Sequence, residues 1–129
     1  MSLSIHRITS LKVYFLPVQT RMPLKFGPET LTSATLLRVA MRIVDTANRQ
    51  AQGWGETPLS VQWVWPSQSP YTVRHDTLKQ FCLELARAWA TFPMTGHALE
   101  AGHDFQEQSL PHLFSEFNRA RTNGSGETT

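Results

Sequence analysis

The stretch Gly53-Trp-Gly-Glu-Thr-Pro-Leu-Ser60 decides the fold, because it closes the last of three segments that have the pattern of β-strands. Gly53 and Gly55 have no side chains, so the backbone there can bend or let another group approach closely. Pro58 is expected to stop this strand, because proline has no backbone N–H for a neighbouring strand. The sequence therefore predicts a third strand over residues 50–57, followed by a loop.

Two earlier segments alternate apolar and polar residues with a period of two, the first over residues 3–15 and the second over residues 35–44. This period is typical of half-buried strands. Pro17 is expected to end the pairing of the first strand. The segment Arg21-Met-Pro-Leu-Lys-Phe-Gly27 would then be a loop, and residues 45–49 would be a turn. Together the three segments predict an antiparallel meander.

After residue 65 the apolar residues recur every three or four positions, which is the period of amphipathic helices. A long helix is expected over residues 72–92, with Ser69 or Thr72 as its cap and Pro93 at its end. Shorter helices are expected over residues 97–102 and 109–121.

This order of strands followed by helices predicts an α+β fold, a three-stranded antiparallel β-meander followed by a small helical bundle. Residues 1–121 are expected to form this single domain. Residues 122–129 carry no apolar side chain, so we expect a flexible tail or an interrupted linker there.

The composition is that of an ordinary folded domain, with 129 residues of which 40% are hydrophobic and 17% are charged. A net charge of +2, spread along the chain, does not favour a nucleic-acid surface. The N-terminus lacks the apolar core of a signal peptide, and no stretch approaches the ~20 apolar residues that span a bilayer. We therefore expect a cytoplasmic protein without a nucleic-acid or membrane partner.

The loop at 21–27, the Gly53–Ser60 stretch and the order of the strands and long helix together resemble the start of an enolase-superfamily enzyme. The resemblance is to the mandelate racemase and muconate lactonizing enzyme type, and it covers about Ile5 to Phe92. It implies an N-terminal capping domain with an enolase N-terminal domain-like fold, which selects the substrate by closing over a (β/α)8 barrel. Such a barrel needs about 250 residues, so the catalytic barrel is expected to be absent from this chain.

In that superfamily the barrel carries a Lys-x-Lys base motif, a second base and three acidic magnesium ligands. The three lysines of this chain, Lys12, Lys25 and Lys79, include no pair two residues apart. The resemblance implies that an intact relative abstracts a proton next to a carboxylate with Mg²⁺, as a racemase, cycloisomerase or dehydratase, and is thus an isomerase or a lyase. This chain alone is expected to be inactive, with no catalytic residue, cofactor or metal of its own.

The resemblance implies that Arg21 and Lys25 contact the carboxylate of the substrate, because the loop between the first two strands folds over the bound acid in these caps. Arginine binds a carboxylate through two parallel hydrogen bonds, and lysine adds a point charge. Phe26 would wall the pocket. Alternatively, both cations are solvated, and Phe26 with Met22 fastens the loop to the sheet.

Glu56 and Thr57 complete the predicted substrate-binding set. A single carboxylate is not an acid–base pair, so Glu56 is expected to accept hydrogen bonds that fix the Gly-Glu turn. Residues 57–60 would form a second loop that faces the mouth of the barrel, where the size of side chains such as Thr57 selects among substrates.

The histidines, the cysteine and the tryptophans have simpler interpretations. The five histidines lack the spacing of a zinc site, so we expect surface imidazoles. Cys82 is the only cysteine and is expected to be a buried thiol. Trp89 is expected in the core, whereas at least one of Trp63 and Trp65 should be exposed and favour self-association.

The expected partner is a (β/α)8 barrel, in the same protein or as a separate chain, and in the intact enzyme a small molecule that bears a carboxylate. Two alternatives stay open. The chain could be a stand-alone binding or assembly module that uses the cap fold, or one half of a split enzyme.

Overall fold

The computed structural model describes residues 5–125, without the side chains of Phe26 and of residues 122–125. The elements follow the order β1 (Ile5–Phe26), β2 (Glu29–Asp45), β3 (Gln50–Pro58), α1 (Val61–Val64), α2 (Tyr71–Ala90), β4 (Met94–Thr95), α3 (Ala98–Gln108) and α4 (Leu110–Ser125). The strands form one antiparallel sheet in the order β3-β2-β1-β4. The predicted α+β class and the meander are confirmed, and the short strand β4 was not predicted.

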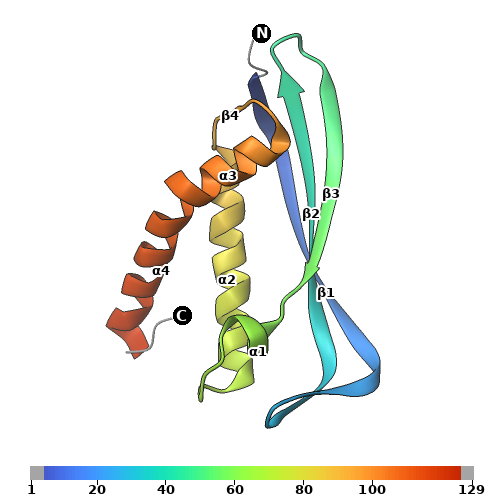
Figure 1. Cartoon of the computed structure of the whole chain (residues 1–129), viewed down its shortest axis with the longest axis vertical. Coiled ribbons are helices and arrows are strands. Elements are labelled where there is room, and N and C mark those ends of the chain that lie inside the picture. The colour runs from blue at the N-terminus through green and yellow to red at the C-terminus, as the bar shows by residue number, and fades with distance from the viewer. Residues whose placement is uncertain (1–4, 126–129) are drawn as a thin grey trace.

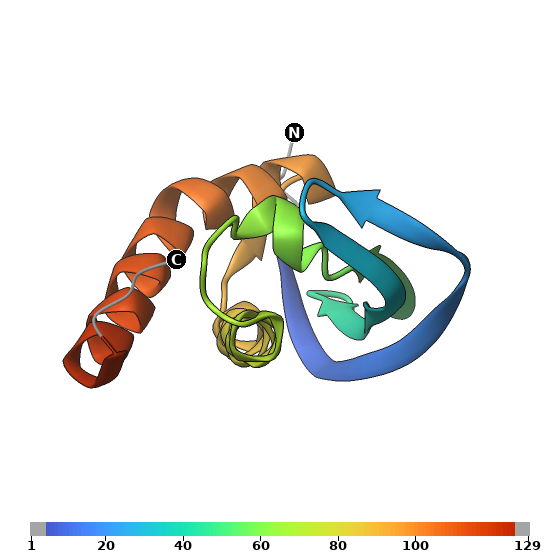
Figure 2. The same cartoon turned by 90° about the horizontal axis from the view of Figure 1, so that it is seen from below.

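The helices lie on one side of the sheet (Figure 1). α2 runs along the sheet, and α4 lies on the far side of α2 from the strands (Figure 2). In the described part of the chain, no helix combines the length and the apolar character needed to cross a membrane.

β1 and β2 form a hairpin much longer than the sequence predicts, with 22 and 17 residues. Pro17 does not end β1 but lies opposite Thr35. The prediction was wrong because β4 pairs only with Ile5 and His6. At Pro17 the other edge of β1 is therefore open among the described residues, and no neighbouring strand needs the missing N–H.

Residues 18–34 extend this hairpin beyond the rest of the sheet, and we call them the hairpin arm (Figure 1). The register of β1 against β2 shifts between Gln19 and Leu24, so the four residues between them bulge out of the ladder. The arm turns at Gly27, whose φ of 57° is in the region that glycine adopts easily. The expected loop over residues 21–27 is therefore mostly strand.

The hydrophobic core lies where the upper end of the sheet meets β4 and α3. Ile8, Met94 and Ala101 are buried together, and Trp89 packs against this cluster. The Trp89 ring also stacks on the Phe105 ring, with 4.2 Å between centroids. The prediction that Trp89 belongs to the core is confirmed.

The predicted turn between the second and third strands is confirmed. The carboxylate of Asp45 accepts hydrogen bonds from the backbone N–H groups of Ala47 and Arg49, both at 2.9 Å. Arg49 also bonds this carboxylate through its side chain at 2.6 Å. The backbone N–H of Arg49 contributes most to lowering the pKa of Asp45, whose ionised form is thereby stabilised.

The long helix is confirmed within two residues at each end, but its predicted cap is wrong. The N-cap position of α2 is Pro70, and no side chain caps it. Instead, Arg74 binds the carbonyl of Ser69 with its side chain and that of Pro70 with its backbone N–H.

The two shorter helices are longer than predicted. α3 begins at a capping box, in which His97 Nδ1 accepts from the backbone N–H of Leu99 and Glu100 accepts from that of His97. α4 continues through Ser125, so the first four residues of the expected tail are helical. Residues 126–129 lie outside the described residues.

Candidate functional site

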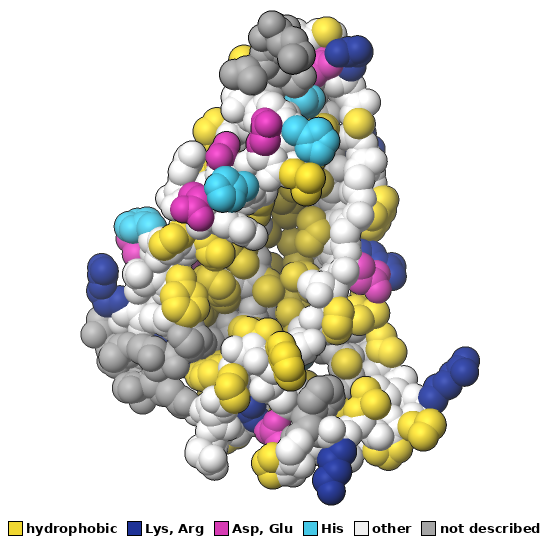
Figure 3. Space-filling model, in the orientation of Figure 1, with side chains coloured by type: hydrophobic (Ala, Val, Ile, Leu, Met, Phe, Trp, Pro, Cys, Tyr) yellow, Lys and Arg dark blue, Asp and Glu magenta, His cyan; other side chains and the backbone are white. Residues whose placement is uncertain are grey.

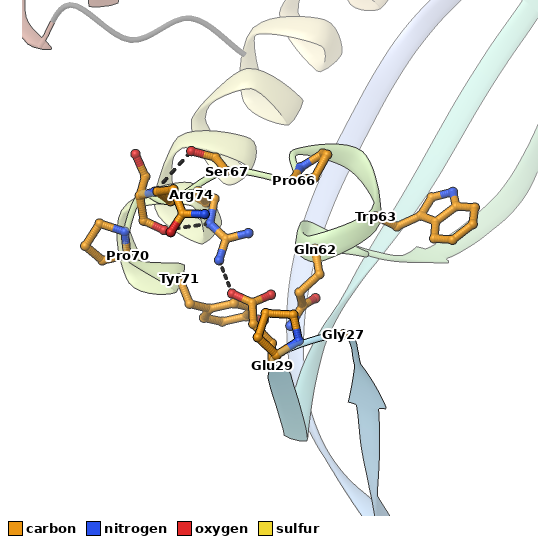
Figure 4. A pocket seen from close by; sticks show the side chains of 12 residues that line it. Gly27, Glu29, Gln62, Trp63, Pro66, Ser67, Pro70, Tyr71 and Arg74 are labelled. Atoms are coloured by element: carbon orange, nitrogen blue, oxygen red, sulfur yellow. Dashed lines mark hydrogen bonds and ion pairs between the residues drawn. The ribbon is translucent and has the colours of Figure 1, made fainter.

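A groove of about 900 Å³ lies between the turn of the hairpin arm and the segment that follows β3. The arm contributes the three residues of its turn. The segment after β3 contributes α1, the connection to α2 and the first turn of α2. The lining residues are Gly27, Pro28, Glu29, Gln62, Trp63, Pro66, Ser67, Gln68, Ser69, Pro70, Tyr71 and Arg74 (Figure 4). The groove thus joins two stretches that are separated by most of β2 and by β3.

Arg74 holds the two sides of the groove together. Its side chain is only 2% exposed. The guanidinium forms an ion pair with Glu29 through Nη2, and Nη1 donates to the carbonyl of Trp65 at 3.1 Å. Nε donates to the carbonyl of Ser69 at 3.0 Å. Each of the three nitrogens is therefore occupied, so Arg74 shapes the groove and is not free to bind an anion.

Three of the lining side chains could contact a ligand in the groove. Gln62 points toward the turn of the arm, and Trp63 points away from Arg74 (Figure 4). Trp63 is 80% exposed, which is unusual for so large an apolar ring. Tyr71 is half-buried and stacks on the ring of His75. Burial raises the pKa of Tyr71, so its hydroxyl remains a neutral donor and acceptor at physiological pH.

The predicted residues Arg21 and Lys25 lie on the hairpin arm, and their side chains are exposed. Phe26 ends β1 next to the turn, but its side chain is outside the described part of the structure. Of the two described side chains, neither Arg21 nor Lys25 lines the groove. The arm reaches the groove through Gly27, Pro28 and Glu29 instead.

Glu56 does not fix a turn, which corrects the prediction. It lies within β3 opposite Arg38 of β2, and their side chains form an ion pair at 2.6 Å on the face of the sheet turned away from the helices. Thr57 is the next residue of β3 and lies opposite Leu37.

The structure does not bring the predicted site residues together. Lys25 lies opposite Thr30, and Glu56 lies opposite Arg38, on the same strand. These two positions of β2 are eight residues apart, which is about 26 Å along a strand. Lys25 and Glu56 are therefore well separated along the sheet, and Thr57 follows Glu56 on β3.

The sequence contains one further signal for the groove, at Arg74. Arg74 occupies a position four residues before Leu78, and both are buried. An arginine on the apolar stripe of a helix needs a buried partner for its charge. That signal identifies Arg74 but not Glu29, because the pairing depends on how the arm folds.

The sheet and the helices also enclose a hollow that apolar side chains line (Figure 3). On the helix side of the sheet, Val39 and Met41 lie opposite Gly55 and Gly53 of β3. Because neither glycine has a side chain, β3 adds no wall above these two residues. Met41 packs against the buried cluster of Ile8, Met94 and Ala101.

The histidines are not all surface imidazoles. His103 and His112 are exposed, and His112 pairs with Glu116 at 3.2 Å. His75, by contrast, is half-buried and bonds the hydroxyl of Thr35 through Nε2 at 2.7 Å. In the part of the chain that the structure describes, no three His, Cys, Asp or Glu side chains gather in a group that could hold a metal ion.

Comparisons with protein-family models, with curated proteins and with solved structures find no match.

Proposed function

We propose that this chain is the substrate-selecting cap of an enolase-superfamily enzyme of the mandelate racemase and muconate lactonizing enzyme type. The order of the elements, an antiparallel meander followed by helices, supports this proposal. The observation that carries it is the ion pair between Glu29 and Arg74, which joins the turn of the arm to the segment after β3. The resemblance implies substrate contacts from residues 21–27 and 57–60, which lie next to these two stretches in the chain.

The groove would then cover the binding site of a small molecule that bears a carboxylate. Gln62 offers an amide, Tyr71 a neutral hydroxyl and Trp63 an exposed ring. Arg74 is already neutralised by Glu29. In this proposal the charge of the substrate is met by the exposed cations Arg21 and Lys25 of the arm or by the barrel.

The chemistry belongs to the barrel in this proposal. In an intact relative, Mg²⁺ and the barrel bases would abstract the proton next to the carboxylate and stabilise the resulting enediolate. In this proposal the oxygen ligands that Mg²⁺ prefers come from the barrel. The role of this chain is to bind, to orient and to exclude water.

Two experiments test the proposal. The purified chain, incubated with Mg²⁺ and a panel of hydroxy acids and amino-acid derivatives in deuterated water, should exchange no α-proton above background. Exchange above background would contradict the inactive-cap assignment.

The second experiment asks whether a barrel binds. The chain and its Trp63→Ala variant would each be used to capture proteins from native extract, and the captured proteins would be identified by mass spectrometry. The proposal predicts that the original chain retains a barrel of about 250 residues with a Lys-x-Lys motif, and that the variant retains less of it. That result would support a cap that binds a separately encoded barrel.

The exposed Trp63 also favours the second candidate, a stand-alone binding or assembly module. That module would capture a protein other than a barrel through the same groove. The identity of the captured protein therefore separates the two functions.

A further inference from the structure

β3 is an open edge of the sheet. Within the described residues it pairs only with β2, and all nine of its residues are exposed. Natural proteins protect such edges with charged side chains, prolines or bulges, because free N–H and C=O groups pair readily with another strand. The outer edge of β1 has that protection, with Pro17, Pro23 and a bulge. β3 has a single proline, Pro58, at its last position, and its one charged side chain, Glu56, is paired with Arg38 of the same sheet.

The alternation of the strand identifies which backbone groups of β3 face outward. The backbone N–H of Leu59, directly after β3, donates to the carbonyl of Thr35 at 2.9 Å. The β2–β3 ladder has no register shift, so N–H and C=O groups face β2 at every second residue, through positions 57, 55, 53 and 51. Gln50, Gln52, Trp54 and Glu56 therefore direct these groups toward the open edge. Pro58, which has no N–H, also falls in this outward set.

We propose that this edge pairs with a second copy of the chain, β3 against β3, antiparallel about a two-fold axis at Trp54. Trp54 is the central residue of Gln50–Pro58, so this register pairs the whole strand. Gln52 then lies opposite Glu56 of the partner subunit, and Gln50 lies opposite Pro58 of the partner subunit. Every outward N–H of β3 meets a carbonyl, and the missing N–H of Pro58 falls at the end of the ladder.

The side chains on the face away from the helices complement one another in this register. Within one chain, Arg42 donates to Gln52 at 3.0 Å, and Arg38 binds Glu56 at 2.6 Å. The paired sheets place Gln52 between Arg42 of its own chain and Glu56 of the partner subunit. Its amide oxygen accepts from Arg42, which leaves the amide N–H₂ to donate to that carboxylate.

The two sides of the proposed interface also fit sterically. On the helix side Gly53 lies opposite Gly55 of the partner subunit, so no side chain obstructs the approach. On the other side the Trp54 rings meet near the axis. Trp54 is 61% exposed and stacks on Tyr14 at 6.2 Å between centroids, which orients the ring. Exposed tryptophan is characteristic of protein interfaces.

A cross-linking experiment tests the register. In a Cys82→Ala background, Trp54→Cys places two thiols across the axis, where paired Cα atoms are about 5.5 Å apart and within the range of a disulfide. Gln50→Cys is the matched control, because its two copies would lie about 27 Å apart. Mild oxidation should give a covalent dimer of the first variant and none of the second. Equal cross-linking of both variants, or of neither, would overturn the proposal.

A charge substitution tests the pairing with Trp54 intact. Gln52→Glu places a carboxylate opposite Glu56 of the partner subunit on both sides of the axis, while within one chain it gains an attraction to Arg42. Sedimentation equilibrium should show a dimer whose dissociation constant rises about tenfold in this variant. Gln106→Glu, on the exposed side of α3, makes the same change away from β3 and should leave the constant unchanged. A monomer at submillimolar concentration, or equal constants for the original chain and Gln52→Glu, would refute the dimer.

Discussion

Arg74 of α2 and Glu29 of β2 form an ion pair although they are 45 residues apart in the chain. The guanidinium is almost fully buried, whereas the carboxylate is one-third exposed. Arg74 therefore connects the hairpin arm to the helices. The shape of the groove depends on this one side chain.

Arg74→Lys should lower the free energy of unfolding by about 2–4 kcal/mol. A lysine ammonium cannot reach Glu29 and the carbonyls of Trp65 and Ser69 at once, so buried acceptors lose their donors. Urea unfolding followed by tryptophan fluorescence measures the change. Arg87→Lys, at an exposed ion pair with Glu84, is the matched control and should cost less than about 0.5 kcal/mol. Equal effects of the two substitutions would show that Arg74 is not an anchor.

Truncation to alanine should lower the free energy of unfolding much more at Trp65 than at Trp63. Trp65→Ala should cost about 3–4 kcal/mol, because this ring is only 5% exposed and packs under the Arg121 guanidinium at 4.6 Å. Trp63→Ala should change the free energy of unfolding by less than about 0.5 kcal/mol, since the side chain is mostly exposed. Thermal and urea unfolding of both variants make the comparison. A large loss at Trp63 would mean that this ring supports the fold rather than a ligand.

Gly96 and Gly102 should also behave differently when replaced by alanine. Gly96 has φ 79°, and an added Cβ would come within 2.0 Å of the Glu100 carboxylate that caps α3. Gly96→Ala should therefore destabilise the protein by about 1–2 kcal/mol. Gly102 lies inside α3 with no atom within 4 Å of an added Cβ, so Gly102→Ala should stabilise it by about 0.5–1 kcal/mol. If unfolding curves show that both substitutions change the free energy of unfolding in the same direction, this account of the capping box is wrong.

The stability of the protein should depend on pH through Asp45. Its folded pKa is below the ordinary value of 3.8, mainly because the backbone N–H of Arg49 bonds the carboxylate. The folded state therefore holds fewer protons at this site, and its contribution is complete above pH 3.8. This contribution is lost as the pH falls through the folded pKa. The stability difference between the protein and Asp45→Asn should shrink over that acidic range and stay constant near neutrality, which urea unfolding at several pH values would detect.

The thiol of Cys82 should react slowly in the folded protein. Burial raises its pKa, so the thiolate fraction at mildly alkaline pH is lower than in an exposed cysteine. Reaction with an aromatic disulfide reagent should accelerate strongly when urea unfolds the chain. A folded-state rate equal to the unfolded one would show that the thiol is accessible and not protected by the packing of α2.

The sequence predicts elements well where their periodicity is long and uninterrupted. β3 and α2 were located within one or two residues, because Gly53, Gly55 and Pro58 indicate β3 and an apolar stripe over 72–92 identifies α2. β4 has only two residues, which is too short for any period to be recognised. The hairpin arm was missed for a different reason. Pro17 is compatible with a strand whose outer edge is open, and whether an edge is open depends on tertiary structure.

The candidate site was harder to predict than the fold. The two predicted loops were sought at residues 21–27 and 57–60, whereas the groove uses the turn after the first and the residues after the second. Glu29 and Arg74 meet only because the arm bends back toward α1 and α2. A single sequence contains no local pattern that reports this long-range contact. Glu56 was found as a notable residue, but the register that pairs it with Arg38 decided its role.

Gly53 and Gly55 leave the hollow without a wall on the side of β3, and added Cβ atoms there would meet nothing within 4 Å. Larger residues at these positions could therefore reshape the apolar surface while the strands keep their register. Related chains could diverge at two codons and acquire differently contoured surfaces on an unchanged scaffold. In this protein the freedom to reshape that surface thus resides in two positions that presently carry no side chain.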